Sequence, residues 1–375
     1  MLSSYFTRAV NGESNIIANR DTMTSCFTDD VVQASKIFDI STLLPSHTAL
    51  TEQEAFLSNN GEASLPLSLR ILQWNINCLY GPDTDSKQDG RDLLALIALI
   101  NPDIVLIQEA NNRSMPDDPH IGNAKCFSRL LSNTGYSLFN TCGVYFSMVA
   151  IRNGIPIDNS RPAFWLHDTY DDTGCIYLSI SLKAKEIAAS PMLGILGTHL
   201  TYKNYTPPLI GQATKGVRFQ EVTKIVNFVD NVWHECNSLI SVPNKNSLIG
   251  AILATDYNQA REIDKSPEHW SVLSQGVATV GEPTDDGVAQ LLQENGYTCT
   301  YDVPSIQTNY RSAGKMAPDF THWTGSTIDF CYLWQPPNTD DDATTASIRP
   351  VGSYVIPSPL SDHLPIVTDF EISYK

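Results

Sequence analysis

The alternation of apolar and polar positions divides the chain near residue 70. From there to the end, short apolar runs of strand length recur between polar turn clusters, and they alternate with segments of helical periodicity. We predict strands at residues 69–76, 104–108, 144–151, 176–182, 193–198, 248–254, 328–333 and 364–370, and helices at 92–100, 216–233 and 286–295. Many strands with interspersed helices indicate an α/β sheet protein in one domain over residues 70–375.

The first 69 residues have a different texture. They hold 3 basic and 8 acidic residues, many Ser, Thr and Asn, and only short apolar clusters such as Ile37-Phe38 and Leu43-Leu44. A segment of this composition buries little apolar surface when it folds alone. We therefore expect residues 1–69 to form a poorly ordered N-terminal tail, whose removal up to residue 65 leaves the domain stable.

The net charge of the chain bears on which kinds of partner it can bind. The 375 residues include 24 Lys and Arg against 41 Asp and Glu, a balance of −17. From Arg70 onward the counts are 21 and 33, a balance of −12. Proteins that hold a long duplex contact its phosphates with Lys and Arg. The sequence therefore predicts weak binding to duplex DNA, while a small cationic or metal-based site stays compatible with these totals.

Cysteine spacing and hydropathy bear on the compartment. The eight cysteines are dispersed without a CxxC pair, a pattern that favours free thiols in a reducing compartment over a zinc ribbon or a disulfide framework. No apolar run reaches the roughly 18 residues of a membrane span. We expect an intracellular protein, cytoplasmic or nuclear, with organellar targeting left open; the oligomeric state is not predicted.

Polar residues stand at the ends of the predicted strands, where α/β proteins build their sites. They occur in this order along the chain: Trp74-Asn75-Ile76-Asn77, Gln108-Glu109, Thr198-His199-Leu200, Thr255-Asp256-Tyr257-Asn258, Thr327-Ile328-Asp329-Phe330 and Ser361-Asp362-His363. Each short motif has an ordinary structural explanation, such as an Asx-turn or a solvated carboxylate. Six in one order are much more specific than any one of them.

In order and spacing, these motifs resemble the endonuclease/exonuclease/phosphatase superfamily, the deoxyribonuclease-I-like proteins. The resemblance spans about residues 70–370 and implies a four-layer α/β sandwich built on two sheets. Because it has His199, the sequence resembles the branch of this superfamily that has two active-site histidines. Thr327, at a position that is commonly Arg, speaks against a close match to the abasic-site endonucleases.

The resemblance also implies roles for the residues. Glu109 would be the main ligand of Mg²⁺, or of Mn²⁺, with Asn75, Asn77 and Asp362 in its surroundings. Asp256 would orient and deprotonate the attacking water, and Asn258 would hold that water or a phosphate oxygen. Asp329 would hold a cationic His363 against the phosphoryl oxygens, and Arg218, near the start of a predicted helix, would contact substrate, unless it simply pairs along the helix surface. The complete list is catalytic Asp256, His363, His199, Asp329 and Asn258; metal-binding Glu109, Asn75, Asn77 and Asp362; and substrate-binding Arg218.

This set is suited to hydrolysis of a phosphoester, because a hard cation with oxygen ligands and a charged donor neutralise the phosphoryl group while water attacks. We favour a Mg²⁺-dependent phosphodiesterase. Two alternatives stay open: a phospholipid or inositol-phosphate phosphohydrolase of the same fold, and a catalytically silent module that binds a phosphorylated partner. The other histidines, at 47, 120, 167, 234, 269 and 322, are expected to be structural or surface residues.

Overall fold

The computed structural model describes most of the chain from residue 40 onward. The described residues are 40–53, 66–77, 91–110, 131–141, 147–166, 174–182, 191–201, 216–238, 247–264, 266–267, 271, 287–310, 316–318, 320–322, 326–337, 346–358 and 360–374.

Two sheets of seven strands form the centre of the described structure. The first sheet has the order β11 (Gln307–Thr308), β13 (Ala346–Val355), β14 (Ile366–Tyr374), β1 (Leu67–Asn75), β2 (Ile104–Gln108), β4 (Met148–Arg152), β3 (Tyr136–Asn140). The second has the order β10 (Tyr297–Cys299), β12 (Asp329–Trp334), β9 (Leu248–Asp256), β8 (Met192–Thr198), β7 (Gly174–Ser181), β5 (Ile157–Asp158), and β6 (Phe164–Trp165) also pairs with β7.

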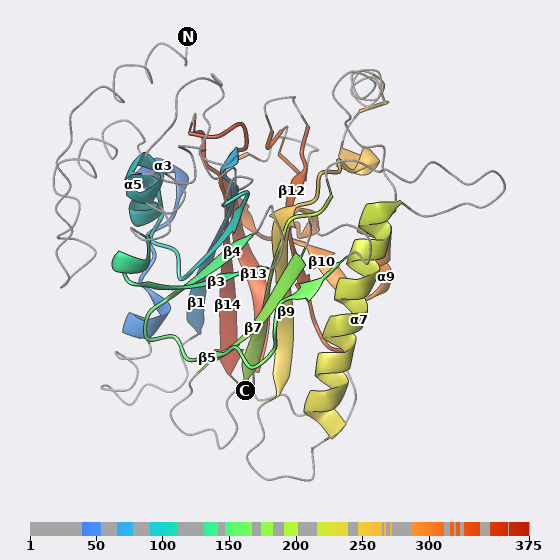
Figure 1. The fold of residues 1–375 in the computed structure, drawn as a ribbon. Helices are drawn as coiled ribbons and strands as arrows, with labels where there is room; N and C mark the ends of the chain where they lie inside the picture. Colours follow the sequence, from blue (N-terminus) through green and yellow to red (C-terminus); the bar gives the residue numbers. More distant parts are fainter. Residues whose placement is uncertain are drawn as a thin grey trace, which may run out of the picture.

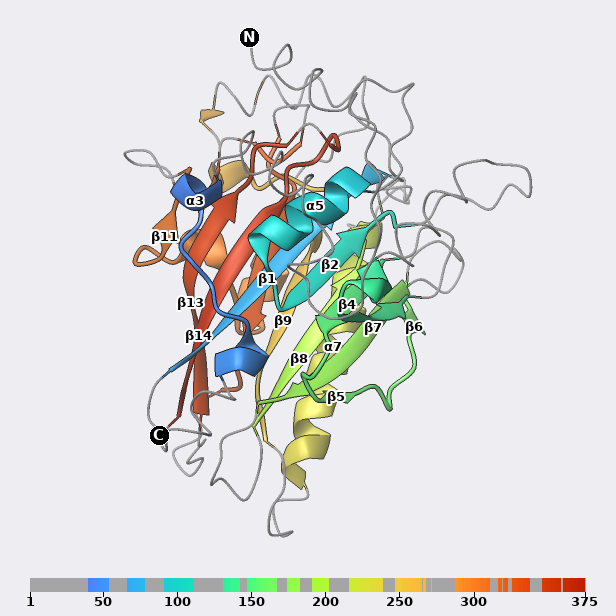
Figure 2. The same cartoon turned by 90° about the vertical axis from the view of Figure 1, so that its left-hand side faces the viewer.

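The helices lie on the outer faces of the two sheets (Figures 1 and 2). On the first sheet are α3 (Ile40–Leu43) and α5 (Arg91–Ile100), and on the second α7 (Val217–Ser238) and α9 (Val288–Glu294); the short 3₁₀ turns are η2 (Glu262–Asp264) and η3 (Thr300–Asp302). Three apolar clusters fill the spaces between these layers, the middle one between the two sheets. The predicted four-layer α/β sandwich is therefore confirmed.

Strand direction brings the polar motifs to one rim. β1 and β2 are parallel, with Asn75 opposite Gln108, and β8 and β9 are parallel in the other sheet. β12 runs antiparallel to β9 and begins with Asp329 opposite Asp256. The carboxyl ends of the parallel strands and the start of β12 therefore meet at the same edge of the sandwich.

Most predicted strands and helices occur within a few residues of their expected bounds, but six described strands were not predicted: the longer β3 and β13 and the short β5, β6, β10 and β11. β13 contains Pro350 and Gly352, with a shift of register between them, and Pro and Gly normally argue against a strand. β13 tolerates them because the irregularity is local and both neighbouring strands continue to pair with it. The start of the strand predicted at 144–151 and that of the helix predicted at 286–295 lie outside the described residues.

Part of the expected tail is packed against the domain. In the segment of residues 40–53, Ile40, Leu44 and Leu50 are buried, and the backbone N–H of Leu50 donates to Oδ1 of Asp103 at 2.8 Å. β1 begins at Leu67, before the expected boundary. Few apolar residues suffice here because they dock on an existing core rather than forming their own. The deletion of residues 1–65 is therefore no longer expected to be neutral.

Among the described helices, none is both long and apolar enough to cross a lipid bilayer.

Candidate active site

The predicted polar residues at the rim converge on the carboxylate of Asp256, which is 1% exposed. Its Oδ2 accepts from Nδ2 of Asn75 at 3.0 Å and lies 3.3 Å from Nε2 of His199 and 3.6 Å from Nε2 of His363. Its Oδ1 accepts the backbone N–H of Asn258 at 2.7 Å. Burial by itself raises the pKa of Asp256, but the charges of His363 and His199 and these hydrogen bonds outweigh it and lower the pKa. Asp256 is therefore an ionised acceptor at neutral pH.

His363 lies between two carboxylates. Its Nδ1 is 2.9 Å from Oδ2 of Asp329, and its Nε2 faces Asp256. Burial opposes protonation of His363, but Asp329 and Asp256 outweigh it and raise the pKa to about 10. At neutral pH the ring is an imidazolium whose Nε2–H is directed into the site.

Two buried residues that the sequence motifs did not single out orient Asp329. Gln73 donates from Nε2 to Oδ1 of Asp329 at 2.8 Å across the two sheets, and Thr321 donates its hydroxyl to Oδ2 at 2.7 Å. Gln73 lies between Leu72 and Trp74 on β1. Its only indication in the sequence was that it is a polar residue inside a predicted strand. Its partner lies 256 residues away in sequence.

Glu109 follows β2 with its side chain 23% exposed at the rim. Its Oε1 accepts from Nδ2 of Asn75 at 3.1 Å and lies 3.9 Å from Nε2 of His199. Asn75 accepts the backbone N–H of Asn77 on Oδ1 at 2.9 Å, so one amide connects the first motif to both carboxylates. Burial opposes protonation of His199, but Asp256 and then Glu109 outweigh it and raise its pKa.

Backbone strain is concentrated at this rim. Of the described non-glycine residues with positive φ, three are Asn77 at 43°, Glu109 at 53° and Asn258 at 50°. The left-handed region is uncommon for residues with a Cβ, and it persists where surrounding contacts hold it. All three are motif residues that the sequence analysis selected on other grounds.

Asp362 and His322 lie close to each other beside His363. Nε2 of His322 lies 3.7 Å from Oδ2 of Asp362, and the ring centroids of His322 and His363 are 4.5 Å apart. Burial raises the pKa of Asp362, but His322 and His363 beside it lower the pKa overall. His322, which the sequence analysis treats as structural, thus belongs to the site region. Its only sequence signal was its place directly after Thr321 and shortly before β12.

The first half of this constellation lies in a part of the chain that matches a known family. Residues 72–208 match the model of the Endonuclease/Exonuclease/phosphatase family, a range that includes Asn75, Glu109 and His199. Over that range the chain is similar to this family. Asp256, Asp329 and His363 lie beyond the matched range, and the structure brings them to the same carboxylate cluster.

One solved structure supports this fold, and others are similar over most of their length. The human Nocturnin catalytic domain with bound sulfate anion is 17% identical, with 83% of this chain and 96% of that chain covered and a TM-score of 0.51. An endonuclease/exonuclease/phosphatase from Bacteroides vulgatus is 14% identical, with 82% and 99% covered and a TM-score of 0.49. D. rerio TDP2 complexed with single strand DNA product is 17% identical, with 81% and 98% covered and a TM-score of 0.43. No curated protein sequence matches the chain.

Arg218 lies on a helix, whereas the other predicted site residues lie at or near the ends of strands. It is 1% exposed at the start of α7, and its Nη1 donates to the backbone carbonyls of Asn258 at 2.9 Å and Thr201 at 3.3 Å. A pairing along the helix surface does not describe this residue, because the guanidinium reaches across to two loops of the site. Contact with substrate stays a prediction.

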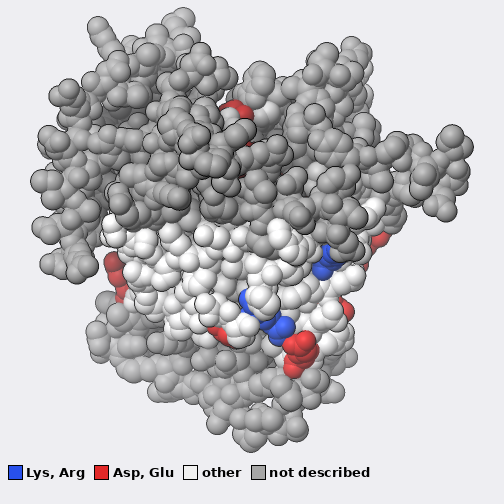
Figure 3. All heavy atoms as spheres, in the orientation of Figure 1, with Lys and Arg blue, Asp and Glu red and all other residues white. Residues whose placement is uncertain are grey.

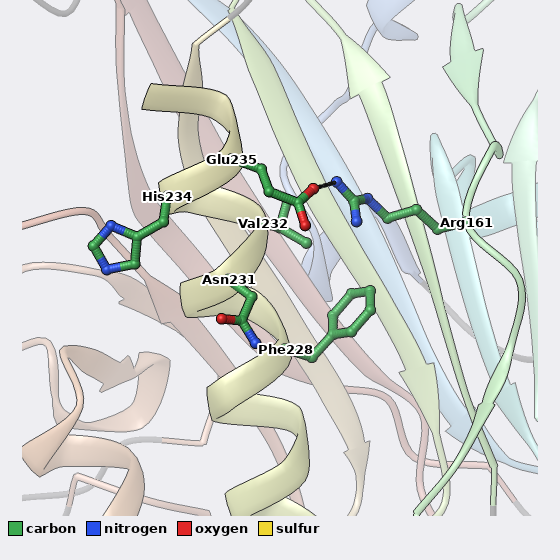
Figure 4. A pocket seen from close by; sticks show the side chains of 6 residues that line it. All are labelled: Arg161, Phe228, Asn231, Val232, His234 and Glu235. Atoms are coloured by element: carbon green, nitrogen blue, oxygen red, sulfur yellow. Dashed lines mark hydrogen bonds and ion pairs between the residues drawn. The ribbon is translucent and has the colours of Figure 1, made fainter. Parts of the chain in front are cut away.

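A surface hollow of about 430 Å³ lies along the last turns of α7 (Figure 4). Its lining residues are Arg161, Phe228, Asn231, Val232, His234 and Glu235. Arg161 pairs with Glu235 at 2.6 Å, and His234 points away from that pair. Because none of these residues belongs to the rim constellation and their charges already pair, we assign the chemistry to the rim.

Proposed function

We propose that this protein is a divalent-metal-dependent phosphodiesterase whose reaction is centred on Asp256. The supporting observation is one ionised, buried carboxylate that lies within 3.6 Å of two histidines and accepts hydrogen bonds from two asparagines. In phosphoester hydrolysis the protein must orient a water and stabilise charge on the phosphoryl oxygens. A buried acceptor surrounded by positive donors is suited to both tasks.

The donor set at Glu109 fits a hard cation. The side chains of Glu109 and Asp362 are partly exposed at the rim, 23% and 20%, and both offer carboxylate oxygens. Mg²⁺ and Mn²⁺ prefer oxygen ligands and retain several waters, so few protein ligands are needed. When bound, such a cation would supply Lewis-acid stabilisation of a phosphoryl oxygen. We propose that Glu109 holds it, with Asn75, Asn77 and Asp362 in its surroundings.

Asp256 would accept a hydrogen bond from the attacking water. Because its pKa is lowered, the carboxylate is a weak base, so it orients the water first and takes the proton as the new P–O bond forms. Asn258 would hold the same water or a phosphoryl oxygen with its amide. The hydrogen bond from its backbone N–H to Asp256 fixes these two groups relative to each other.

His363 and His199 would stabilise the charge that develops on the phosphoryl oxygens. The imidazolium of His363 is held by Asp329 through Nδ1, which leaves its Nε2–H as a donor of fixed direction. A preorganised, buried donor is worth more than the same group in water, because no solvent reorganises around it during the reaction. His199 approaches the same carboxylate from β8 and supplies a second donor.

The substrate would be a small or single-stranded phosphodiester. The net charge of −12 on residues 70–375 repels a polyanion. A short substrate carries fewer phosphates and is therefore repelled less. On the face shown in Figure 3, the described Lys and Arg side chains are isolated and stand near acidic ones. We would therefore assay single-stranded DNA, RNA, 5′-tyrosyl DNA, sphingomyelin and inositol polyphosphates, each with Mg²⁺ and with Mn²⁺.

Asp256→Asn is the decisive variant, because it keeps the shape of the side chain and removes the negative charge. We expect turnover of any substrate found to fall by about 10² or more per folded molecule, with a lower melting temperature because the two histidines lose the charge of their partner. Asp158→Asn, at an exposed carboxylate on β5, is the matched control and should retain full turnover. Wild-type turnover in Asp256→Asn would refute the proposed role. Phosphate-ligand binding without hydrolysis in the whole screen would favour the silent binding module.

A further inference from the structure

The first turn of α7 contacts the backbone of two site loops through a pair of buried charged residues. Arg218 and Glu221 are 1% and 0% exposed. Nη1 of Arg218 donates to the carbonyl of Asn258 at 2.9 Å and to that of Thr201 at 3.3 Å. Glu221 accepts the backbone N–H of Thr201 at 3.0 Å and its hydroxyl at 2.5 Å. Buried charges are costly to place, so two of them directed at loop backbone call for an explanation.

Both contacted loops carry a residue of the proposed mechanism. Thr201 lies two residues after His199, and Asn258 lies two residues after Asp256, the last residue of β9. The two turns also contact each other: Nδ2 of Asn258 donates to the carbonyl of Leu200 at 2.9 Å and lies 2.8 Å from Nε2 of His199. A displacement of either turn would therefore move the asparagine amide and the histidine together.

Asn258 is held in a conformation that it would not adopt by preference. Its φ of 50° is left-handed, and such a residue persists where neighbouring groups hold it. Of the two carbonyls that Arg218 contacts, that of Asn258 is the nearer, and the N–H of Asn258 is bonded to Asp256. Arg218 and Asp256 thus restrain the two ends of this strained residue.

We propose that Arg218 and Glu221 are positioning residues that hold Asn258 and the turn of His199 in the geometry needed for phosphoester hydrolysis. This inference rests on the function proposed above. It assigns Arg218 an action through Asn258 and Thr201, in place of direct contact with substrate. The pair forms a mechanical connection between α7 and the reacting groups, and the charges serve to direct hydrogen bonds at carbonyl and amide groups of the backbone.

Kinetics of a double-mutant cycle test this role. Arg218→Met keeps the length of the side chain and removes its donors, and we expect kcat to fall about 10-fold or more, with KM within about threefold of wild type. In an Asn258→Ala background, the same change should cost less, because the Asn258 side-chain amide that Arg218 positions through the backbone is already absent and only the contribution through Thr201 is left. Arg218→Lys should be intermediate. Equal losses in both backgrounds would refute positioning through Asn258.

Controls separate positioning from folding. Arg70→Met removes another buried arginine, which bonds to Asp369 and to the carbonyls of Ile100 and Pro45, away from the rim. It should lower the melting temperature and leave kcat per folded molecule unchanged. Thr201→Val removes only the hydroxyl donor to Glu221, so it gives a mild variant should Arg218→Met fail to fold. A kcat reduced equally by Arg70→Met would contradict the assignment.

Hydrogen exchange tests the same contacts without a substrate. In Arg218→Met and in Thr201→Val, amides in residues 199–201 and 256–258 should exchange faster than in wild type, and those of β14 should not. Unchanged exchange at both turns would overturn the proposal whatever the kinetics show. If the wild-type protein hydrolyses nothing in the screen, the proposed function fails and this measurement alone decides whether the two residues hold the turns.

Discussion

Leu50→Ala measures how firmly the N-terminal segment of residues 40–53 is docked. Leu50 is 1% exposed and lies in the apolar cluster between the sheets with residues of β1 and β2. Its backbone N–H also donates to the buried Asp103. If this segment were the poorly ordered tail that its composition suggests, Leu50→Ala would leave stability unchanged. Because Leu50 is packed in the core, we expect the substitution to lower stability.

The expected loss follows from burial. Truncating a fully buried Leu costs about 2–5 kcal/mol, because transfer free energy is lost and a cavity is left. At a urea dependence of about 3 kcal/mol per M, this lowers the unfolding midpoint by about 1 M. Thr48→Ala, two residues earlier and exposed, changes a surface position and should stay within about 0.5 kcal/mol of wild type.

Equilibrium urea unfolding of the three proteins, followed by far-UV circular dichroism, is the assay. The slope should be common to all, so that a shift of midpoint reports stability.

Two truncations test the docking of the whole segment in the same assay: the chain without residues 1–39 is the reference, and the chain without residues 1–53 should be less stable. That second truncation removes the buried Leu50 side chain and two hydrogen bonds of Asp103, one from the N–H of Leu50 and one with Nε2 of His47. A Leu50→Ala midpoint equal to that of Thr48→Ala would refute the docking.

Three further predictions concern the site and its partners. Because the pKa of His363 is raised to about 10 and its charged form is the proposed donor, kcat/KM should hold up to about pH 9 and fall above pH 10; an alkaline limb near the ordinary histidine value would contradict this. Chelation with EDTA should abolish hydrolysis and Mg²⁺ or Mn²⁺ should restore it, with Glu109→Gln needing a higher metal concentration; full activity after exhaustive chelation would exclude the metal role. Duplex DNA should bind weakly in anisotropy titrations at physiological salt, and tight, steeply salt-dependent binding would reveal a basic patch that the −12 balance conceals.

The local pattern of the sequence was sufficient for most strands, both longer helices and the order of the motifs. Apolar runs such as residues 104–108 and 248–254 have the length and composition of buried strands, and the polar residue that ends each run marks the rim. Glu109, His199 and Asp256 could therefore be placed at strand ends without coordinates. β13 could not be predicted, because its Pro and Gly are tolerated only through pairing with β11 and β14.

Tertiary structure decided which polar groups meet. Gln73 and Asp329 bond across the two sheets, His322 comes against His363 through an isolated pairing of distant segments, and Asn75 joins Glu109 to Asp256. Periodicity reports which face of an element is apolar, but the partner of a polar side chain depends on how two sheets stack and on their register. The same reason explains residues 40–53 and Arg218. Their composition and position were readable from the sequence, whereas the core on which the segment docks and the carbonyls that Arg218 contacts exist only once the two sheets and α7 have packed.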